Sequence, residues 1–187
     1  MAESAASALP GARFDGMALV EEAGLVGMIT LRARLDAPEV AQAVEAAVGQ
    51  GVPGQRGLAM AEGRGVAWMA PDELMLMLPH GEVAEAITTL EAALEGVFAT
   101  VADVSDARAV FRIRGPRAGE VLMKLCPVDI VALQPGEIRR TRAAQVAAAI
   151  WVSGEQEFGL ICFRSVAAHV FDLLSTAAAP GGEVLAD

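Results

Sequence analysis

The fold is decided by Asp103-Val-Ser-Asp-Ala-Arg-Ala-Val-Phe-Arg-Ile-Arg-Gly-Pro-Arg-Ala-Gly-Glu-Val-Leu-Met-Lys-Leu-Cys-Pro-Val-Asp129. Apolar and basic side chains alternate from Ala109 to Arg114, which predicts a strand with one buried face. Pro116 suits the first turn of a helix and Pro127 cannot continue one, so a helix is expected between them. A strand and an apolar-faced helix in direct succession indicate one core shared by both kinds of element.

Outward from this stretch, the same two patterns alternate along the whole chain. The expected strands are 27–35, 66–70, 73–78, 97–104, 109–114, 138–142, 146–152 and 158–163, with helices starting near residues 38, 82, 116 and 165. The order βαββαββαβββα has too few helices for a doubly wound parallel sheet. We therefore predict the α+β class, with mainly antiparallel sheets, helices on one face and two loosely similar halves.

Local signals refine this interpretation. Asp36 and Glu39 form a capping-box-like pair at the start of the first helix, and Ser165 is placed to cap the last one. The glycines of 49–54 have the spacing of a dinucleotide-binding fingerprint, but they follow a helix and enclose Pro53, so we predict a loop.

The chain is expected to contain one domain with short extensions. We interpret residues 1–24 as a flexible or partner-ordered arm, residues 25–178 as a single α+β domain and residues 179–187 as a tail. The length of 187 residues is sufficient for a sizeable core.

Charge and composition argue against several kinds of partner. The chain has 24 acidic and 14 basic residues, and its net charge of -10 opposes a phosphate backbone, so we expect no nucleic-acid partner. The longest uncharged stretch, 143–154, is too short to span a membrane, which needs about 20 residues. Cys126 and Cys162 are too few for a disulfide framework and fit a reducing compartment, so we expect a cytoplasmic location.

No complete catalytic or metal-binding motif is present in the sequence, so we assign no catalytic residue and no metal site. The histidines are His80 and His169, and neither belongs to a recognisable triad or zinc motif. Arg108, Arg112, Arg114 and Arg117 form a basic run that is either a solvated strand face or a contact for an anionic ligand or acidic partner.

The carboxylates Asp103, Asp106 and Asp129, together with Arg108, are the remaining polar cluster. A carboxylate at a strand end can hold an amine or a pterin-like ring by charge-assisted hydrogen bonds. Asp106 can equally cap the turn between two strands, and Asp129 can cap the structure after Pro127. We favour the structural roles.

Five segments in order then resemble one protein family, from about Gly27 to Thr176. They are Trp68-Met-Ala-Pro-Asp-Glu-Leu-Met-Leu76, Asp103-Val-Ser-Asp-Ala-Arg108, Gly115-Pro-x-Ala-x-x-x-Leu-x-Lys-x-Cys-Pro-x-Asp129, Arg140-Thr-Arg142 and Phe163-Arg-Ser-Val-Ala167. Together they resemble the gamma subunit of heterotetrameric sarcosine oxidase. The resemblance implies the fold of the folate-binding domain of glycine-cleavage aminomethyltransferases.

The resemblance also implies a function. It indicates a small, non-catalytic assembly subunit that works with alpha, beta and delta subunits in the oxidative demethylation of sarcosine to glycine, with hydrogen peroxide as a product and the one-carbon unit passed to tetrahydrofolate. Flavin, NAD, zinc and tetrahydrofolate are implied for the other subunits, and no cofactor for this chain.

The family pattern also bears on a folate site. Folate-using relatives have an Asn-Asp pair where 127–129 falls and a Gly-Gly with paired acids where 145–150 falls, whereas this chain keeps only Asp129 of these groups. The weak remnant-site candidates are therefore Asp106, Arg108 and Asp129. The alternative functions are a stand-alone folate-binding or aminomethyl-transfer protein and, on architecture alone, a ferredoxin-like sensor domain of small molecules.

Overall fold

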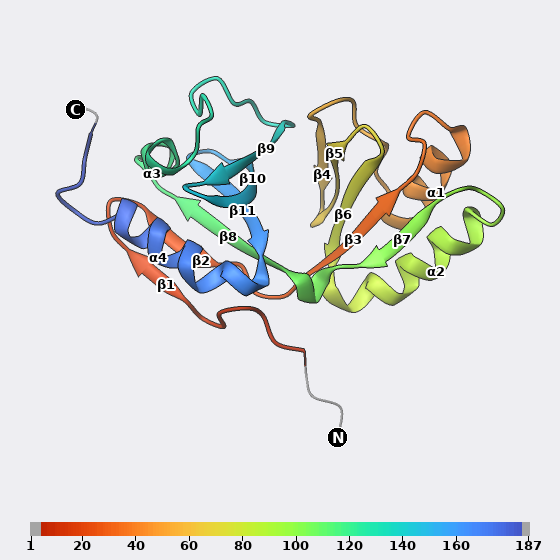
Figure 1. Cartoon of the computed structure of the whole chain (residues 1–187), viewed down its shortest axis with the longest axis horizontal. Helices are drawn as coiled ribbons and strands as arrows, with labels where there is room; N and C mark the ends of the chain where they lie inside the picture. The colour runs from red at the N-terminus through yellow and green to blue at the C-terminus, as the bar shows by residue number, and fades with distance from the viewer. Residues whose placement is uncertain (1–4, 185–187) are drawn as a thin grey trace. The chain divides into compact units, whose positions relative to one another are not determined.

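The computed structural model describes residues 5–184 of the chain, and these residues form two compact units. Unit 2 is the continuous segment Leu25–Ser105. Unit 1 is discontinuous and combines the chain up to Gly24 with the chain from Asp106 onward. Each unit contains one sheet and two α-helices (Figure 1).

Unit 2 is built on a five-stranded sheet in the order β4-β5-β6-β3-β7, with antiparallel pairing throughout. Its elements are β3 (Val26–Arg32), α1 (Pro38–Val48), β4 (Leu58–Ala61), β5 (Arg64–Ala70), β6 (Glu73–Pro79), α2 (Val83–Ala93) and β7 (Thr100–Asp103). Both helices lie on the same side of the sheet in Figure 1. Their apolar faces pack with Ile29, Leu31 and Leu76 in one buried cluster.

Unit 1 is built on a six-stranded antiparallel sheet in the order β1-β2-β8-β11-β10-β9. Its elements are β1 (Arg13–Asp15), β2 (Leu19–Glu22), β8 (Arg108–Arg114), α3 (Ala118–Leu125), β9 (Ile138–Ala143), β10 (Val146–Gly154), β11 (Glu157–Phe163) and α4 (Ala167–Ala177). In β8, Phe111 and Ile113 are fully buried while Arg112 is exposed, as the alternation predicts.

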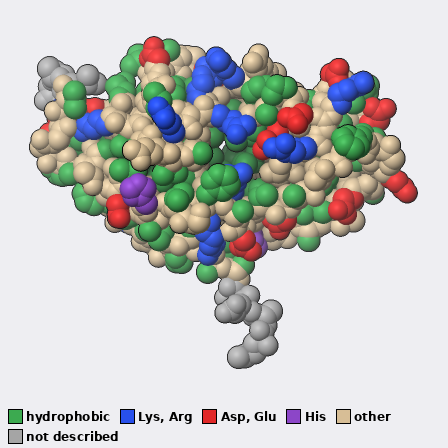
Figure 2. Space-filling view, in the orientation of Figure 1, with side chains coloured by type: hydrophobic (Ala, Val, Ile, Leu, Met, Phe, Trp, Pro, Cys, Tyr) green, Lys and Arg blue, Asp and Glu red, His purple; other side chains and the backbone are tan. Residues whose placement is uncertain are grey.

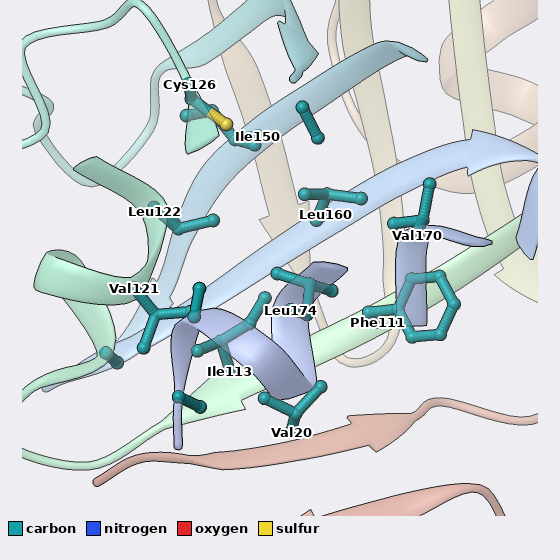
Figure 3. Close-up of a cluster of buried hydrophobic side chains, with 14 of the residues drawn as sticks. Val20, Phe111, Ile113, Val121, Leu122, Cys126, Ile150, Leu160, Val170 and Leu174 are labelled. Carbon is teal, nitrogen blue, oxygen red and sulfur yellow. The ribbon is translucent and has the colours of Figure 1, made fainter. Parts of the chain in front are cut away.

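The core of unit 1 lies between its sheet and the helices α3 and α4 (Figure 3). Side chains from β8, β11 and β10 meet Val121 and Leu122 of α3 and Val170 and Leu174 of α4. The Phe111 ring also stacks with Phe171, with 6.2 Å between the ring centroids. Val20 of β2 belongs to the same cluster. This strand near the start of the chain therefore contributes to the core of unit 1.

The structure confirms the α+β class, the antiparallel pairing and the placement of helices on one face. It also confirms the loop expected for residues 49–54, which contain no helix or strand. Gly49 ends α1 in the left-handed conformation with φ of 70°. Among residues 5–184, no helix is long and apolar enough to cross a membrane.

The interpretation of residues 1–24 as an arm differs from the structure of the described part. Residues 13–15 and 19–22 form β1 and β2, and β2 pairs with β8 through Val20↔Ile113. Arg164 also donates hydrogen bonds to the carbonyl oxygens of Ala6 and Ser7, at 2.9 and 3.2 Å. Residues 1–4 lie outside the described residues.

The expected single domain, 25–178, likewise differs from the observed division, which falls after Gly24 and Ser105. The pairing of β2 with β8 joins segments that are far apart in the sequence, and this pairing defines unit 1. Of the expected tail, Val184 donates its N–H to Glu120 on α3. Residues 185–187 lie outside the described residues.

Two expected helix caps are wrong. Ala37 occupies the N-cap of α1 without a side-chain hydrogen bond, and Asp36 instead pairs with Arg34 at 2.9 Å. Ser165 lies within a 3-10 turn, Arg164–Val166, that precedes α4, whose N-cap is Val166. In both places the chain enters the helix through a local turn.

Candidate functional site

Asp106 and Arg108 lie together where the chain enters β8. Asp106 is exposed in the 3-10 turn Ser105–Ala107, and Arg108 is the first residue of β8. The Arg108 guanidinium lies over the Phe163 ring, 4.1 Å from its centroid, on the neighbouring strand β11. This cation–π contact is typical of arginine and holds the side chain against the sheet.

The turn before β8 is capped by Asp103, not by Asp106 as the sequence led us to expect. The Asp103 carboxylate accepts hydrogen bonds from the Ser105 N–H at 2.9 Å and the Ser105 hydroxyl at 2.6 Å. The buried Ser105 hydroxyl oxygen in turn accepts the Met28 N–H at 3.0 Å. Asp103 and Ser105 therefore stabilise the end of β7 within unit 2.

Asp129 has the structural role that we favoured from the sequence. Its side chain is exposed in the loop after α3, and it accepts the N–H of Ala132 at 3.2 Å. A carboxylate that binds a backbone N–H three residues later is a common way to close a turn. The structure thus brings Asp106 and Arg108 together and places Asp129 on a different loop.

The basic run divides into paired and solvated side chains. Arg114 and Arg13 both donate to the carboxylate of Glu21 on β2. The Arg114 hydrogen bond, followed by the Coulombic effect of both arginines, lowers the pKa of Glu21, although burial opposes the shift. Arg117 donates to Glu120 at 2.8 Å, whereas Arg112 is exposed.

Both cysteines are free and buried. Burial raises the pKa of Cys126 from 9.0 to about 11, and it raises the pKa of Cys162 to the same value even though Arg108 opposes the shift. The thiols therefore stay protonated at neutral pH, which disfavours nucleophilic attack and metal ligation, since both require a thiolate. The neighbour Lys124 donates instead to the Ala177 carbonyl oxygen at 2.9 Å.

Two surface cavities are lined mainly by residues that the sequence did not single out, with Lys124 and His169 as the exceptions. The larger, about 420 Å³, lies at α3 and α4 and is lined by Lys124, Leu125, His169, Asp172, Leu173, Thr176, Ala177 and Gly182. The smaller, about 260 Å³, lies in unit 2 beside the Arg64–Glu82 ion pair. The periodicity that places these residues on exposed helix faces does not reveal a cavity.

The candidates for a remnant folate site, Asp106, Arg108 and Asp129, line neither of these cavities. Within residues 5–184, no group of three or more His, Cys, Asp or Glu side chains is arranged to hold a metal ion. Within residues 103–129, Asp103 and Asp129 cap turns, Arg114 and Arg117 pair with glutamates, and Arg108 stacks on Phe163.

The sequence comparison identifies the family. Residues 32–180 match the profile of the sarcosine oxidase, gamma subunit family. The chain belongs to this family. The gamma subunit of sarcosine oxidase from Corynebacterium sp. (strain P-1) is 35% identical over 131 residues, which are 68% of this chain and 64% of that protein. The chain thus matches just under two thirds of that relative's length.

Solved structures agree with the family assignment. A chain of the heterotetrameric sarcosine oxidase from Corynebacterium sp. U-96, solved in complex with pyrrole 2-carboxylate, superimposes with a TM-score of 0.82 at 26% identity. The match covers 94% of this chain and 91% of that one. Aminomethyltransferase T of the glycine cleavage system from Bartonella henselae matches 85% of this chain and 46% of its own, with a TM-score of 0.62 and 16% identity, so it shares the fold.

Proposed function

We propose that this chain is the small, non-catalytic assembly subunit of a heterotetrameric sarcosine oxidase. Its partners are the alpha, beta and delta subunits, and the complex oxidatively demethylates sarcosine to glycine and passes the one-carbon unit to tetrahydrofolate. The observation that carries the proposal is the superposition on a chain of a heterotetrameric sarcosine oxidase over 94% of the sequence. A match that spans both units supports a role for the whole chain.

The non-catalytic role is supported by what the polar residues do. Asp103 and Asp129 are used as turn caps, Arg108 is stacked on Phe163 and the two thiols are held in the protonated form. We accordingly propose that flavin, NAD, zinc and tetrahydrofolate are held by the other subunits. The free cysteines are also consistent with a cytoplasmic location, which is part of the proposal.

Co-expression tests the assembly role. The alpha, beta and delta subunits are produced with and without this chain, purified through a tag on the alpha subunit and compared by size-exclusion chromatography and sarcosine-dependent peroxide formation. We expect this chain to co-elute in equal stoichiometry and to raise the yield of active, flavin-containing complex. An equally stable and active complex without the chain contradicts the proposal.

A folate titration separates this role from that of a stand-alone folate-binding protein. Calorimetry of the isolated chain with tetrahydrofolate is expected to give no binding heat. An Asp129→Asn variant is the matched control, because Asp129 is the acid retained from the folate-using pattern. Saturable binding that this variant abolishes would assign a folate site to the chain itself.

A further inference from the structure

Phe98 is a large apolar side chain in the turn between α2 and β7, and it is fully exposed. By comparison, the exposed side chains of Met60 and Phe163 reach only 46% and 45%. The neighbours of Phe98, Val97 and Ala99, both pack against the core of unit 2. Since the backbone is anchored on both sides, the Phe98 side chain is directed away from that core.

The turn that carries Phe98 leads directly into an edge strand. Strand β7 is the last in the five-stranded sheet and pairs on one side with β3. The Val104 N–H donates to the Met28 carbonyl oxygen on β3 at 2.8 Å. Alternate residues of an antiparallel strand face the same neighbour, so the backbone groups of Val101 and Asp103 point away from β3. Such an edge is a template for another strand.

The surroundings of Phe98 are acidic. Residues 83–103 contain Glu85, Glu91, Glu95 and Asp103, all exposed, and no lysine or arginine. Figure 2 shows acidic side chains over the part of the surface where Figure 1 draws α2. A second copy of this chain docked here would place acid against acid, so the complementary partner carries positive charge.

We propose that Phe98, Thr100–Asp103, Glu91 and Glu95 form a docking surface, called here the Phe98 surface, for an extended basic segment of a neighbouring subunit of the oxidase. The segment adds a strand to β7, receives Phe98 in an apolar pocket and places lysine or arginine side chains beside the two glutamates. Aromatic anchors surrounded by a polar rim are common in subunit contacts. The inference rests on the proposed function, because it names the surface by which the chain joins the complex.

The test measures the affinity of the full chain for a complex of the other three subunits. We expect Phe98→Ser to weaken the dissociation constant by about tenfold or more, in the range of an interface hot spot. Phe98→Leu should retain most of the affinity. The matched control is Val131→Ser, because Val131 is 77% exposed in a loop of unit 1, whereas Phe98 belongs to unit 2. The melting temperature of isolated Phe98→Ser should equal that of the wild type.

Charge reversal supplies a second, independent variant. The double substitution Glu91→Lys and Glu95→Lys should weaken the association, and the loss should shrink at high salt because exposed charges are screened. Wild-type affinity in both the Phe98→Ser and the double variant overturns the inference while the proposed function stands. Failure of the wild-type chain to bind the other subunits at all removes both. A wild-type homodimer that Phe98→Ser dissociates, with no effect on the complex, also overturns the inference.

Discussion

At the scale of single residues, Gly159 on β11 packs closely against Trp151 on β10, and the two residues are directly opposed in the sheet of unit 1. A β-carbon at position 159 would lie 2.2 Å from the indole ring. Gly159→Ala therefore forces the ring or the strand to move, and we expect it to lower the free energy of unfolding by about 1–3 kcal/mol. Urea denaturation measures the change.

Gly51→Ala is the control for this substitution. Gly51 has open space around its missing β-carbon and no positive φ. Its replacement should leave the stability unchanged or slightly increase it, since alanine reduces the freedom of the unfolded chain. Equal effects of the two substitutions would show that Trp151 does not lie against Gly159.

The two buried thiols predict a loss of stability in alkali. Their pKa is about 11 in the folded chain against 9.0 for a free thiol, so unfolding releases protons between these values. The contribution of the thiols to the free energy of unfolding should be constant below about pH 8 and fall from about pH 9 to 11, by at most about 1.4 kcal/mol per pH unit and thiol.

Denaturation curves under reducing conditions measure this dependence. The chain has no tyrosine and a single lysine, Lys124, so few other groups titrate in this range. The variant with Cys126→Ala and Cys162→Ala should lose most of the slope. A slope that persists in the variant would assign the effect to another group.

The sequence predicted that carboxylates of the cluster Asp103, Asp106 and Asp129 cap turns, but it did not always identify which of them does so. Asp129 caps the turn after Pro127 as expected, because a carboxylate acts on backbone groups only a few residues away. Asp103 and Asp106 flank one turn and are chemically equivalent in the sequence. The choice of Asp103 depends on the buried position of Ser105 beside Met28, which is a contact between distant residues.

At the scale of secondary-structure elements, every segment with a strong periodic pattern formed a helix or strand, whereas three short strands were not predicted. β1, β2 and β4 have three or four residues each, too few to show alternation above background. β1 and β2 are strands because β8 offers an edge to pair with. The paired residues of β2 and β8 are 89 to 95 positions apart in the sequence, so a local pattern cannot indicate this pairing.

The position of β2 in the core predicts the effect of shortening one of its side chains, Val20. Val20 is fully buried between β1 and β8, and Val20→Ala removes two methyl groups from that cluster. We expect a loss of about 1.5–3 kcal/mol in the free energy of unfolding. The matched control Val131→Ala removes the same groups from an exposed loop and should cost less than about 0.5 kcal/mol.

Helix α3 carries a buried carboxylate whose removal should be costly. Glu120 has a side chain that is only 3% exposed, and it pairs with Arg117 at 2.8 Å and Lys124 at 3.7 Å. Glu120→Ala leaves both cations without this partner, and we expect a loss of about 2–4 kcal/mol. Glu45→Ala, on the exposed face of α1, should change the stability by less than about 0.5 kcal/mol. Thermal denaturation measures both variants, and similar losses of stability in Glu120→Ala and Glu45→Ala would contradict a structural role for Glu120.

At the scale of the whole molecule, fold class follows from the order of elements, whereas the division into two units does not. Each unit repeats a sheet with two helices on one side, which agrees with the two expected halves. The boundary depends on which strands pair, and hydrophobic patterning does not specify the partner of a strand. The cavities depend equally on packing between helices.

Charge is distributed unevenly along the chain, and this predicts the salt dependence of assembly. Unit 2 contains four basic and eleven acidic residues, a net charge of -7. The association that we propose between unit 2 and a basic segment of a neighbouring subunit should weaken as salt is added, because the screening length falls to about 10 Å at 0.1 M. Binding measured over a salt series checks this, and no dependence would indicate an apolar contact alone.

The discontinuity of unit 1 also determines the order in which the nascent chain folds on the ribosome. Glu22 pairs with Phe111, so β2 must wait until 89 further residues have been synthesised. At about 5–20 residues per second this delay is on the order of 5 to 20 s. An isolated two-stranded hairpin is only marginally stable in water. Until β8 is synthesised, the backbone groups of β2 that later pair with it have no strand partner. During this time unit 2, whose residues all lie between β2 and β8 in the sequence, is synthesised in full, so we expect it to fold before unit 1.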